Sequence, residues 1–444
     1  MRARAPLLVF LSVASLVAGA CSGNNPQPPK IVQGGWAWNP SVAGDMPLPV
    51  TWTGASAPQQ LPLLPGGDCG ASGSVQALTV KGKAAYAVGT SVACSAGIPS
   101  MMPVAWHDGT VTRLELPAGW AHGTALAAAV VEDDAGKEHV YVAGATGDEF
   151  PLPTIWKDGV LATREPDLML PGGYDAGLIT SLVITTRYAI AGGVLHEAGS
   201  QPPVYLAVVW FLAPDFASGT VDPLLPPAGY GTTTTYGGTV SMAYDGLFVY
   251  SVATLMEGSL EKAVFWVDDA GVPMLGSGFG SSPWGMPTGI ALVGEAPDIT
   301  PYISGLLRSP TSRSTPVPVI WTPSATQVLS TAGEGGAGTG ESIAVDRGWA
   351  FVSGESLGAD PTNGTRFVSV PALWTNGNRA DLPGLTARGG ATVLQKPLFG
   401  WWKVPGAAAA IDWPYPGGFG EIIGPYQVAA GGSAVARTIV AIPP

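Results

Sequence analysis

A phrase centred on one Trp returns seven times along this chain of 444 residues, most clearly as PVAWHDG (103–109) and PTIWKDG (153–159). Successive copies of this Trp are separated by 54, 50, 54, 56, 55 and 53 residues. The seven copies are Trp52, Trp106, Trp156, Trp210, Trp266, Trp321 and Trp374. A step this regular indicates one supersecondary unit, repeated in series, that cannot bury its apolar surface alone.

Each Trp phrase has the same companions. An alternating strand that ends in a small residue precedes it, such as VYVAG (140–144). A short segment such as LELP (114–117) follows it, and then a Gly-rich loop leads to a run of small and β-branched residues such as TALAAAVV (124–131). One period therefore holds about four short strands, which is typical of a β-propeller blade.

We therefore predict an all-β chain that folds as a seven-bladed β-propeller of four-stranded antiparallel blades, with eight blades as the alternative. From the axis outward, each blade should contain the small-residue strand, the VYVAG strand, the Trp strand and the LxLP strand. The first copy, around 31–64, lacks an inner strand. The C-terminal region should supply it, from near 391–396 or from near 434–442, because a closed ring leaves fewer exposed sheet edges.

The repeated phrase itself has a structural explanation. Large aromatic rings at equivalent positions are expected to fill the wedge between blades, so the seven Trp are predicted to be core residues. The HDG, KDG or TNG that follows the Trp should form a tight turn in which Gly adopts a positive φ.

Composition limits the classes of partner. Gly 62 and Pro 42 favour many turns, while 46% hydrophobic residues exclude a mostly disordered chain. The net charge is −12, and it becomes −14 once Arg2 and Arg4 leave with the leader described next. Since no basic stripe is present to neutralise phosphates, nucleic acid is excluded as a partner, and we expect a monomer.

The N-terminus has the features of an export signal. Arg2 and Arg4 precede an apolar run that ends at Ala18 and is too short to span a bilayer. Residues 1–20 are predicted to be a signal peptide, 21–30 a lipidated N-terminus and linker, and 31–444 a single propeller domain. Cys21 after a small pair favours a bacterial lipoprotein, periplasmic or at the cell surface, whereas cleavage by the ordinary secretory peptidase is the alternative.

Two cysteines remain once Cys21 carries lipid. Cys69 and Cys94 lie 12 residues on either side of a predicted hairpin turn near 81–82. In an oxidising compartment the two thiols are expected to form a disulfide that pins this hairpin.

The pairing of VYVAG with PTIWKDG resembles the repeats of secreted bacterial kelch-like propellers of the HAF type, many of them lipoproteins. The resemblance covers about residues 31–390 and rests on short motifs. It implies a fold and an extracellular location, and it brings no catalytic residues. The copper site of the oxidase branch, built from Tyr and His, has no match here.

A binding site is expected where the long loops lie. The strand order places the loops around 90–102, 194–203 and 355–367 on one face of the disc and the D-G turns on the other. Aromatic residues recur where these loops enter the axis: Trp120, Tyr174, Tyr230, Tyr236 and Trp284. We expect them either to stack on a sugar or an apolar peptide at the central channel, or to cover the ends of the inner strands.

The predicted function is a non-catalytic binding or scaffold module for a protein or glycan, without cofactor or metal. The alternative is an extracellular hydrolase or lyase with its site at the channel mouth. Glu341 is the one carboxylate inside its small-residue run, where a loop end is the expected setting, and the four His are scattered. EDDAGKE (132–138) lacks the ligand spacing of a calcium loop and is predicted to be a hairpin turn.

Overall fold

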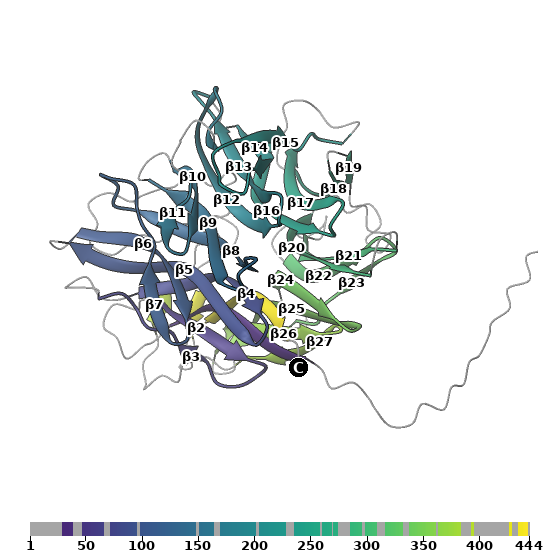
Figure 1. The fold of residues 1–444 in the computed structure, drawn as a ribbon. Helices are drawn as coiled ribbons and strands as arrows, with labels where there is room; N and C mark the ends of the chain where they lie inside the picture. Colours follow the sequence, from purple (N-terminus) through teal and green to yellow (C-terminus); the bar gives the residue numbers. More distant parts are fainter. Residues whose placement is uncertain are drawn as a thin grey trace, which may run out of the picture.

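The structure is a computed structural model. It describes residues 29–38, 47–65, 72–95, 98–147, 151–163, 169–200, 204–227, 235–257, 260–268, 270–273, 285–294, 298–308, 316–331, 337–360, 363–382, 392–394, 426–428 and 434–442. The strands form seven four-stranded antiparallel sheets around a common centre (Figure 1). The prediction of a seven-bladed propeller is therefore confirmed.

The first four blades contain strands of 2 to 12 residues. From the axis outward, blade 1 contains β30 (Ala434–Ile442), β1 (Lys30–Trp38), β2 (Pro47–Thr53) and β3 (Gln59–Gln60). Blade 2 contains β4 (Ser72–Lys81), β5 (Ala84–Ser95), β6 (Ile98–His107) and β7 (Thr110–Arg113). Blade 3 contains β8 (Gly123–Glu132), β9 (Glu138–Thr146), β10 (Leu152–Lys157) and β11 (Val160–Leu161). Blade 4 contains β12 (Tyr174–Ile184), β13 (Ala189–Glu197), β14 (Tyr205–Leu212) and β15 (Gly219–Pro223).

The remaining three blades repeat the same order. Blade 5 contains β16 (Thr235–Tyr244), β17 (Val249–Glu257), β18 (Leu260–Val267) and β19 (Ala270–Pro273). Blade 6 contains β20 (Gly285–Val293), β21 (Thr300–Arg308), β22 (Pro316–Thr322) and β23 (Ala325–Val328). Blade 7 contains β24 (Gly338–Asp346), β25 (Trp349–Asp360), β26 (Asn363–Thr375) and β27 (Asn378–Asp381).

The two ends of the chain close the ring. β30 pairs antiparallel with β1 from Lys30 opposite Ile442 to Ala37 opposite Ala434. Of the two predicted closure strands, the one near 434–442 is therefore correct. The other forms β28 (Thr392–Leu394), which pairs with β29 (Tyr426–Val428) in a separate two-stranded sheet.

The prediction for the outermost strand is wrong by a few residues. In blade 2 this strand is β7, which follows the turn at Asp108 and Gly109 directly and ends before LELP (114–117) begins. The first Leu of LELP, Leu114, is instead buried, and its amide donates to the carbonyl of Pro103. The LxLP segment thus covers the blade edge, because its Pro and its apolar Leu suit a packed connection better than an exposed edge strand.

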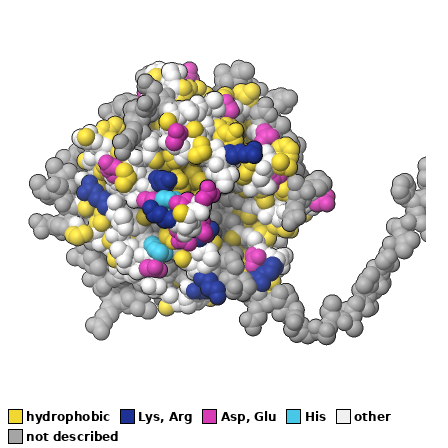
Figure 2. Space-filling view, viewed as in Figure 1, with side chains coloured by type: hydrophobic (Ala, Val, Ile, Leu, Met, Phe, Trp, Pro, Cys, Tyr) yellow, Lys and Arg dark blue, Asp and Glu magenta, His cyan; other side chains and the backbone are white. Residues whose placement is uncertain are grey.

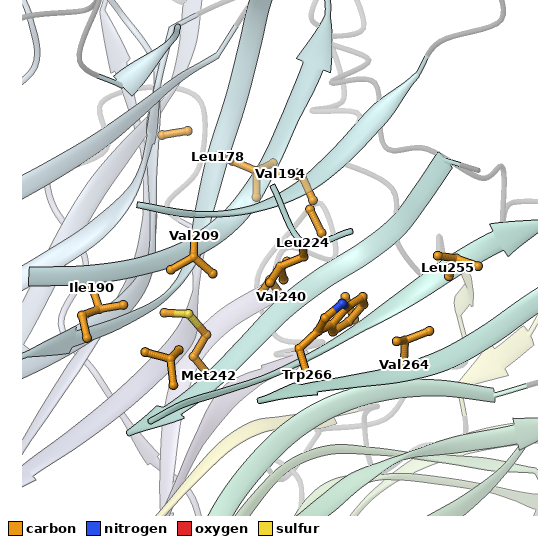
Figure 3. Close-up of a cluster of buried hydrophobic side chains, with 14 residues drawn as sticks. Leu178, Ile190, Val194, Val209, Leu224, Val240, Met242, Leu255, Val264 and Trp266 are labelled. Carbon is orange, nitrogen blue, oxygen red and sulfur yellow. The ribbon is translucent and has the colours of Figure 1, made fainter. Parts of the chain in front are cut away.

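The hydrophobic core is divided among the junctions between blades. Seven clusters of buried side chains among the described residues each combine neighbouring blades. Figure 3 shows one of them, where Trp266 of blade 5 lies near Val240 and Leu224. A single sheet cannot cover its own faces, so each blade gains its burial from the next one.

All seven repeat Trp are buried, with at most 3% of their surface exposed. Burial of about 200 Å² per ring contributes about 5 kcal/mol each by area. Five of the indole N–H groups are described as donors to a carbonyl oxygen 41 or 44 residues earlier, at the end of the preceding blade. The pairs are Trp106 to Pro62, Trp156 to Glu115, Trp210 to Met169, Trp266 to Leu225 and Trp374 to Ser330. Each of these five Trp therefore joins two blades by both packing and hydrogen bonding.

The small residue at the end of the VYVAG motif is required by the close packing of the two inner strands. The inner strands contain a β-bulge at a similar place, for example between Ala125 and Ala127 in β8 and between Gly340 and Ser342 in β24. The bulge brings the inner backbone close to the neighbouring strand. A Cβ built on Gly144 would collide with the carbonyl oxygen of Thr124, and one built on Gly354 with that of Thr339, so a Gly is required at both positions.

The strand order defines two faces. The turn face has the hairpins between the first and second strands and between the third and fourth strands of each blade. The loop face has the remaining connections. On the turn face, Asp158 and Gly159 both have positive φ, as type I′ turns require, and Asn376 and Gly377 repeat this geometry. The predicted D-G turn is confirmed, with the preceding Asp or Asn sharing the positive φ.

Candidate functional site

The described members of the predicted aromatic ring lie where the loop face meets the axis. Trp120 is half-buried three residues before β8, and its amide donates to the carbonyl of Pro117. Tyr174 is half-buried and is the first residue of β12. The backbone of Tyr236 lies in β16 opposite Leu255. Tyr230 and Trp284, and the side chain of Tyr236, lie outside the described residues, so the ring of five remains a prediction.

Polar side chains surround Tyr174 at the loop-face end of blade 4. We call Tyr174, Asp175, His196, Glu197 and Tyr205 the blade-4 site. Tyr174 is opposite Glu197 in the sheet, and His196 is opposite Tyr205 on its other side. Asp175 is the extra residue of a bulge between Tyr174 and Ala176, which pairs with His196. The bulge brings the Asp175 carboxylate to the imidazole.

His196 is held on two sides. Its Nδ1 lies 2.6 Å from Oδ1 of Asp175, so an Nδ1–H donated to the carboxylate forms a charge-assisted hydrogen bond, and a protonated imidazole forms an ion pair. The imidazole and the Tyr205 ring have centroids 5.0 Å apart at an angle of 52°. Because Asp175 engages Nδ1, Nε2 is the imidazole nitrogen that remains to meet a ligand. The His196 side chain is 14% exposed, so the ring is oriented by the protein and still borders solvent.

The two tyrosines of the site are kept protonated. Burial, followed by the negative charge of Asp175, raises the pKa of Tyr205 to about 12. Burial, followed by the charge of Glu197, also raises the pKa of Tyr174. Both phenols therefore act as neutral hydroxyl groups at physiological pH, beside a carboxylate and an imidazole. This set of donors and acceptors suits a ligand rich in hydroxyl or amide groups.

Asp175 and His196 were not recognised as a pair in the sequence. The signal was present, since a hairpin turn at 185–188 brings the first residues of DAGLIT (175–180) toward VLHE (194–197). The register of this hairpin contains two bulges, after Tyr174 and after Ile179. Each bulge shifts the pairing by one residue, so counting back from the turn does not predict which side chains meet.

Two carboxylates of blade 7 lie near the loop-face end of its inner strands. The prediction that Glu341 lies at a loop end is wrong. Glu341 lies at the bulge inside β24, where its Oε1 accepts a hydrogen bond from the Thr339 hydroxyl at 2.9 Å. Glu355 lies opposite Thr339 on β25 and is only 2% exposed. Equivalent positions in other blades hold uncharged residues such as Thr90 and Ala145, so the buried Glu355 is particular to this blade.

The turn face carries a second polar group, on blade 3. His139 Nδ1 lies 2.6 Å from Asp158, and its Nε2 lies 3.2 Å from Asp133. Asp133 Oδ1 accepts the amides of Ala135 and Lys137, and the Lys137 amide is the largest cause of the lowered pKa of Asp133. EDDAGKE is thus a capped hairpin turn, as predicted. Figure 2 shows acidic, basic and histidine side chains close together near the middle of the visible face.

The other histidines do not add to either group. His122 is buried, and its Nδ1 accepts the amide of Met101 at 3.2 Å. His107 stacks on Tyr86, with ring centroids 4.0 Å apart. Within the described part of the chain, no group of three or more His, Cys, Asp or Glu side chains is arranged to hold a metal ion. No helix in that part is long and apolar enough to span a membrane.

The comparisons with known proteins show a distant likeness in fold. No family model matches the sequence, and no curated protein matches it. The similar solved structures include an exo-1,5-α-L-arabinanase from a bovine ruminal metagenomic library, at 10% identity and a TM-score of 0.28, over 61% of this chain and 99% of that one. A Trypanosoma rangeli sialidase is 9% identical with a TM-score of 0.37, over 80% of this chain and 54% of that one. A Bombyx mori GH32 β-fructofuranosidase is 10% identical with a TM-score of 0.31, over 78% and 81%. At these values the likeness carries no information on the activity of this chain.

Proposed function

We propose that this protein is a non-catalytic binding or scaffold module of the cell surface or periplasm that holds a glycan or protein ligand on its loop face. The proposal includes lipid attachment at Cys21 and kinship with the HAF-type kelch-like propellers. The blade-4 site is the observation that supports it most directly. Its oriented Asp175 and His196, next to the half-buried Tyr174, offer a polar ligand both donors and acceptors on a rigid sheet.

A glycan is the ligand class that this chemistry suits best. Sugars present adjacent hydroxyl groups, which a carboxylate and an imidazole can bind, together with apolar faces, which aromatic rings can cover. Tyr174 and Trp120 are half-buried aromatics on the same face and can provide such cover.

A binding screen with matched variants tests the proposal. The mature protein is applied to a glycan array and to a pull-down from extracellular material, and the hits are repeated with Tyr174→Ala, Asp175→Asn and Trp120→Ala. Tyr244→Ala on the opposite face is the control, because Tyr244 is also partly buried and its hydroxyl donates to the turn carbonyl of Gly246. We expect about a tenfold or greater loss of affinity in the first three variants, as removal of a buried binding group costs about 1–3 kcal/mol. Equal binding by all four folded variants would refute the loop-face site.

The second candidate is a hydrolase or lyase acting at the axis of the loop face. Glu341 and Glu355 favour it, because hydrolysis of glycosides uses two carboxylates and these two lie on adjacent strands of one blade. Glu341→Gln should then abolish release of reducing sugar from the polysaccharides that the protein binds. Binding without turnover in the native protein would leave the non-catalytic module as the function.

A further inference from the structure

Three large apolar side chains project from the turn face on two consecutive hairpins. Tyr188 is 52% exposed, Leu247 is 69% exposed and Phe248 is 44% exposed. Tyr188 ends the turn between β12 and β13, and Leu247 and Phe248 occupy the turn between β16 and β17. The hairpins belong to neighbouring blades, since Ile190 and Val249 just after the two turns share one buried cluster. We call these three residues the apolar tip.

Hydrogen bonds within the two turns hold the apolar tip outward. Asp245 Oδ1 accepts the amides of Leu247 and Phe248, both at 2.7 Å, and Asp245 Oδ2 accepts the hydroxyl of Tyr250 at 2.9 Å. In the turn of blade 4, Thr185 Oγ1 accepts the amides of Arg187 and Tyr188. The exposure is therefore built into the turns, where side-chain caps replace the backbone partners.

The N-terminal strand starts on the same face. The second strand of every blade runs from the turn face to the loop face, and β1 is the second strand of blade 1. Lys30 at its start is opposite Ile442 at the end of β30, so both ends of the propeller domain lie on the turn face. Nine residue steps separate Cys21 from Lys30, which reach at most about 30 Å when fully extended.

We propose that the turn face is directed toward the membrane and that Tyr188, Leu247 and Phe248 insert into the interfacial layer of the bilayer. The inference rests on the proposed lipid at Cys21, because that anchor brings the turn face within reach of the lipid surface. Leu supplies apolar contact, and Tyr and Phe are residues found at the boundary between headgroups and acyl chains. The lipid at Cys21 would attach only the N-terminus to the bilayer, and a second contact on the same face would fix the orientation of the propeller, because the anchor raises the local concentration of the apolar tip at the lipid surface. The loop face with the blade-4 site then points away from the membrane.

The contact is apolar more than electrostatic. Without the leader, and so without Arg2 and Arg4, the net charge of −12 becomes −14, which opposes attraction to anionic lipids. Each of the two turns has one charged residue, the cation Arg187 in blade 4 and the anion Asp245 in blade 5. The Asp245 carboxylate already accepts hydrogen bonds from the amides of Leu247 and Phe248. Binding should therefore change little with salt.

The experiment measures orientation on vesicles directly. The full chain is expressed in a bacterial host, purified from the membrane fraction and reconstituted on vesicles of phosphatidylethanolamine and phosphatidylglycerol. Mass spectrometry establishes lipid on Cys21, and hydrogen exchange is compared with that of the soluble Cys21→Ser chain. We expect exchange at residues 185–188 and 245–248 to slow several-fold on vesicles, with no change at 194–200 on the loop face.

Two sets of variants complete the test. Tyr188→Ser, Leu247→Ser and Phe248→Ser combined should remove the protection at both turns, while the lipid on Cys21 keeps the chain on the vesicles. Leu225→Ser with Val328→Ser is the matched control. These side chains are 60% and 50% exposed, but Leu225 follows β15 and Val328 ends β23, so both lie at the outermost strands and not in the turns of the apolar tip. Both sets retain the buried core, and circular dichroism checks that they fold.

The outcomes separate the proposals. Unlipidated Cys21 would overturn both the anchor and the membrane contact. Lipidated Cys21 with unprotected turns, or with protection on the loop face, would overturn the membrane contact alone. Neither result depends on ligand binding at the blade-4 site, which is measured separately with the soluble chain.

Discussion

The two faces of the propeller use different kinds of connection. On the turn face the same hydrogen bond recurs: Asp158, Asp268 and Asn376 each lie in the turn between the third and fourth strands of a blade and accept an amide near the start of the second strand. Among the described residues of the loop face, the connections between blades repeat their backbone and indole bonds, but no side-chain cap of this kind recurs, and the blade-4 site exists on one blade only. The repeated face maintains the fold, and the face that varies is where a site can be built on a rigid scaffold.

The largest expected loss of stability comes from replacing one of the repeat Trp residues. Trp156→Ala should lower the free energy of unfolding by about 3–5 kcal/mol, because it leaves a cavity between two blades and removes the bond to the Glu115 carbonyl. Trp120→Ala on the loop face, where the ring is half-buried, should cost about 1 kcal/mol. Chemical denaturation followed by circular dichroism compares the two. Equal losses would mean that the loop-face ring is also part of the core.

The predicted disulfide concerns the loop-face end of blade 2. Cys94 lies near the end of β5, and Cys69 is outside the described residues. If they are bonded, Cys94→Ser should destabilise the oxidised protein by about 2–4 kcal/mol and leave the reduced protein nearly unchanged. Peptide mapping under non-reducing conditions establishes the bond. Free thiols at both positions in exported protein would contradict the prediction.

A smaller loss of stability is expected when a side chain that caps a turn is replaced. Asp158→Ala removes the acceptor for the Val140 amide at 2.9 Å and the partner of His139, so stability should fall by about 1–2 kcal/mol. Asp158→Asn retains an oxygen for the amide and should cost less. Asp175→Ala on the loop face should alter ligand binding more than stability. Thermal unfolding and ligand binding are both measured for the three variants. Together they show whether the turn face contributes mainly to stability and the loop face mainly to binding.

The smallest expected effect is the change of stability with pH, which depends on one tyrosine on each face. Burial is the main reason that the pKa of Tyr86 on the turn face and of Tyr205 on the loop face is raised to about 12, against about 10 in the unfolded chain. The folded state then binds these protons more tightly, so stability is retained below about pH 10 and falls as the pH rises toward about 12. Ultraviolet absorbance of the phenolates follows the titration, and Tyr86→Phe or Tyr205→Phe should remove one group from it. Titration of both near their ordinary pKa would contradict the burial.

Prediction from the sequence was successful where a feature recurred. The Trp phrase, the VYVAG strand and the small-residue strand were each located from several copies, and blade number and strand order followed. The outermost strand was misplaced because LxLP recurs as well, although it packs as a connection and not as a strand. Glu341 was misjudged because its bulge depends on pairing with the neighbouring strand.

The sequence by itself determined the repeating unit, the number of blades and the burial of the seven Trp, because period and hydrophobicity are local properties that are present in every copy. Only the tertiary structure decided which strand closes the ring, which carbonyl each indole meets and which side chains form the blade-4 site. These depend on bulges and on contacts between segments more than 20 residues apart, such as Asp175 with His196. A shift of one residue in register changes such contacts without changing the period.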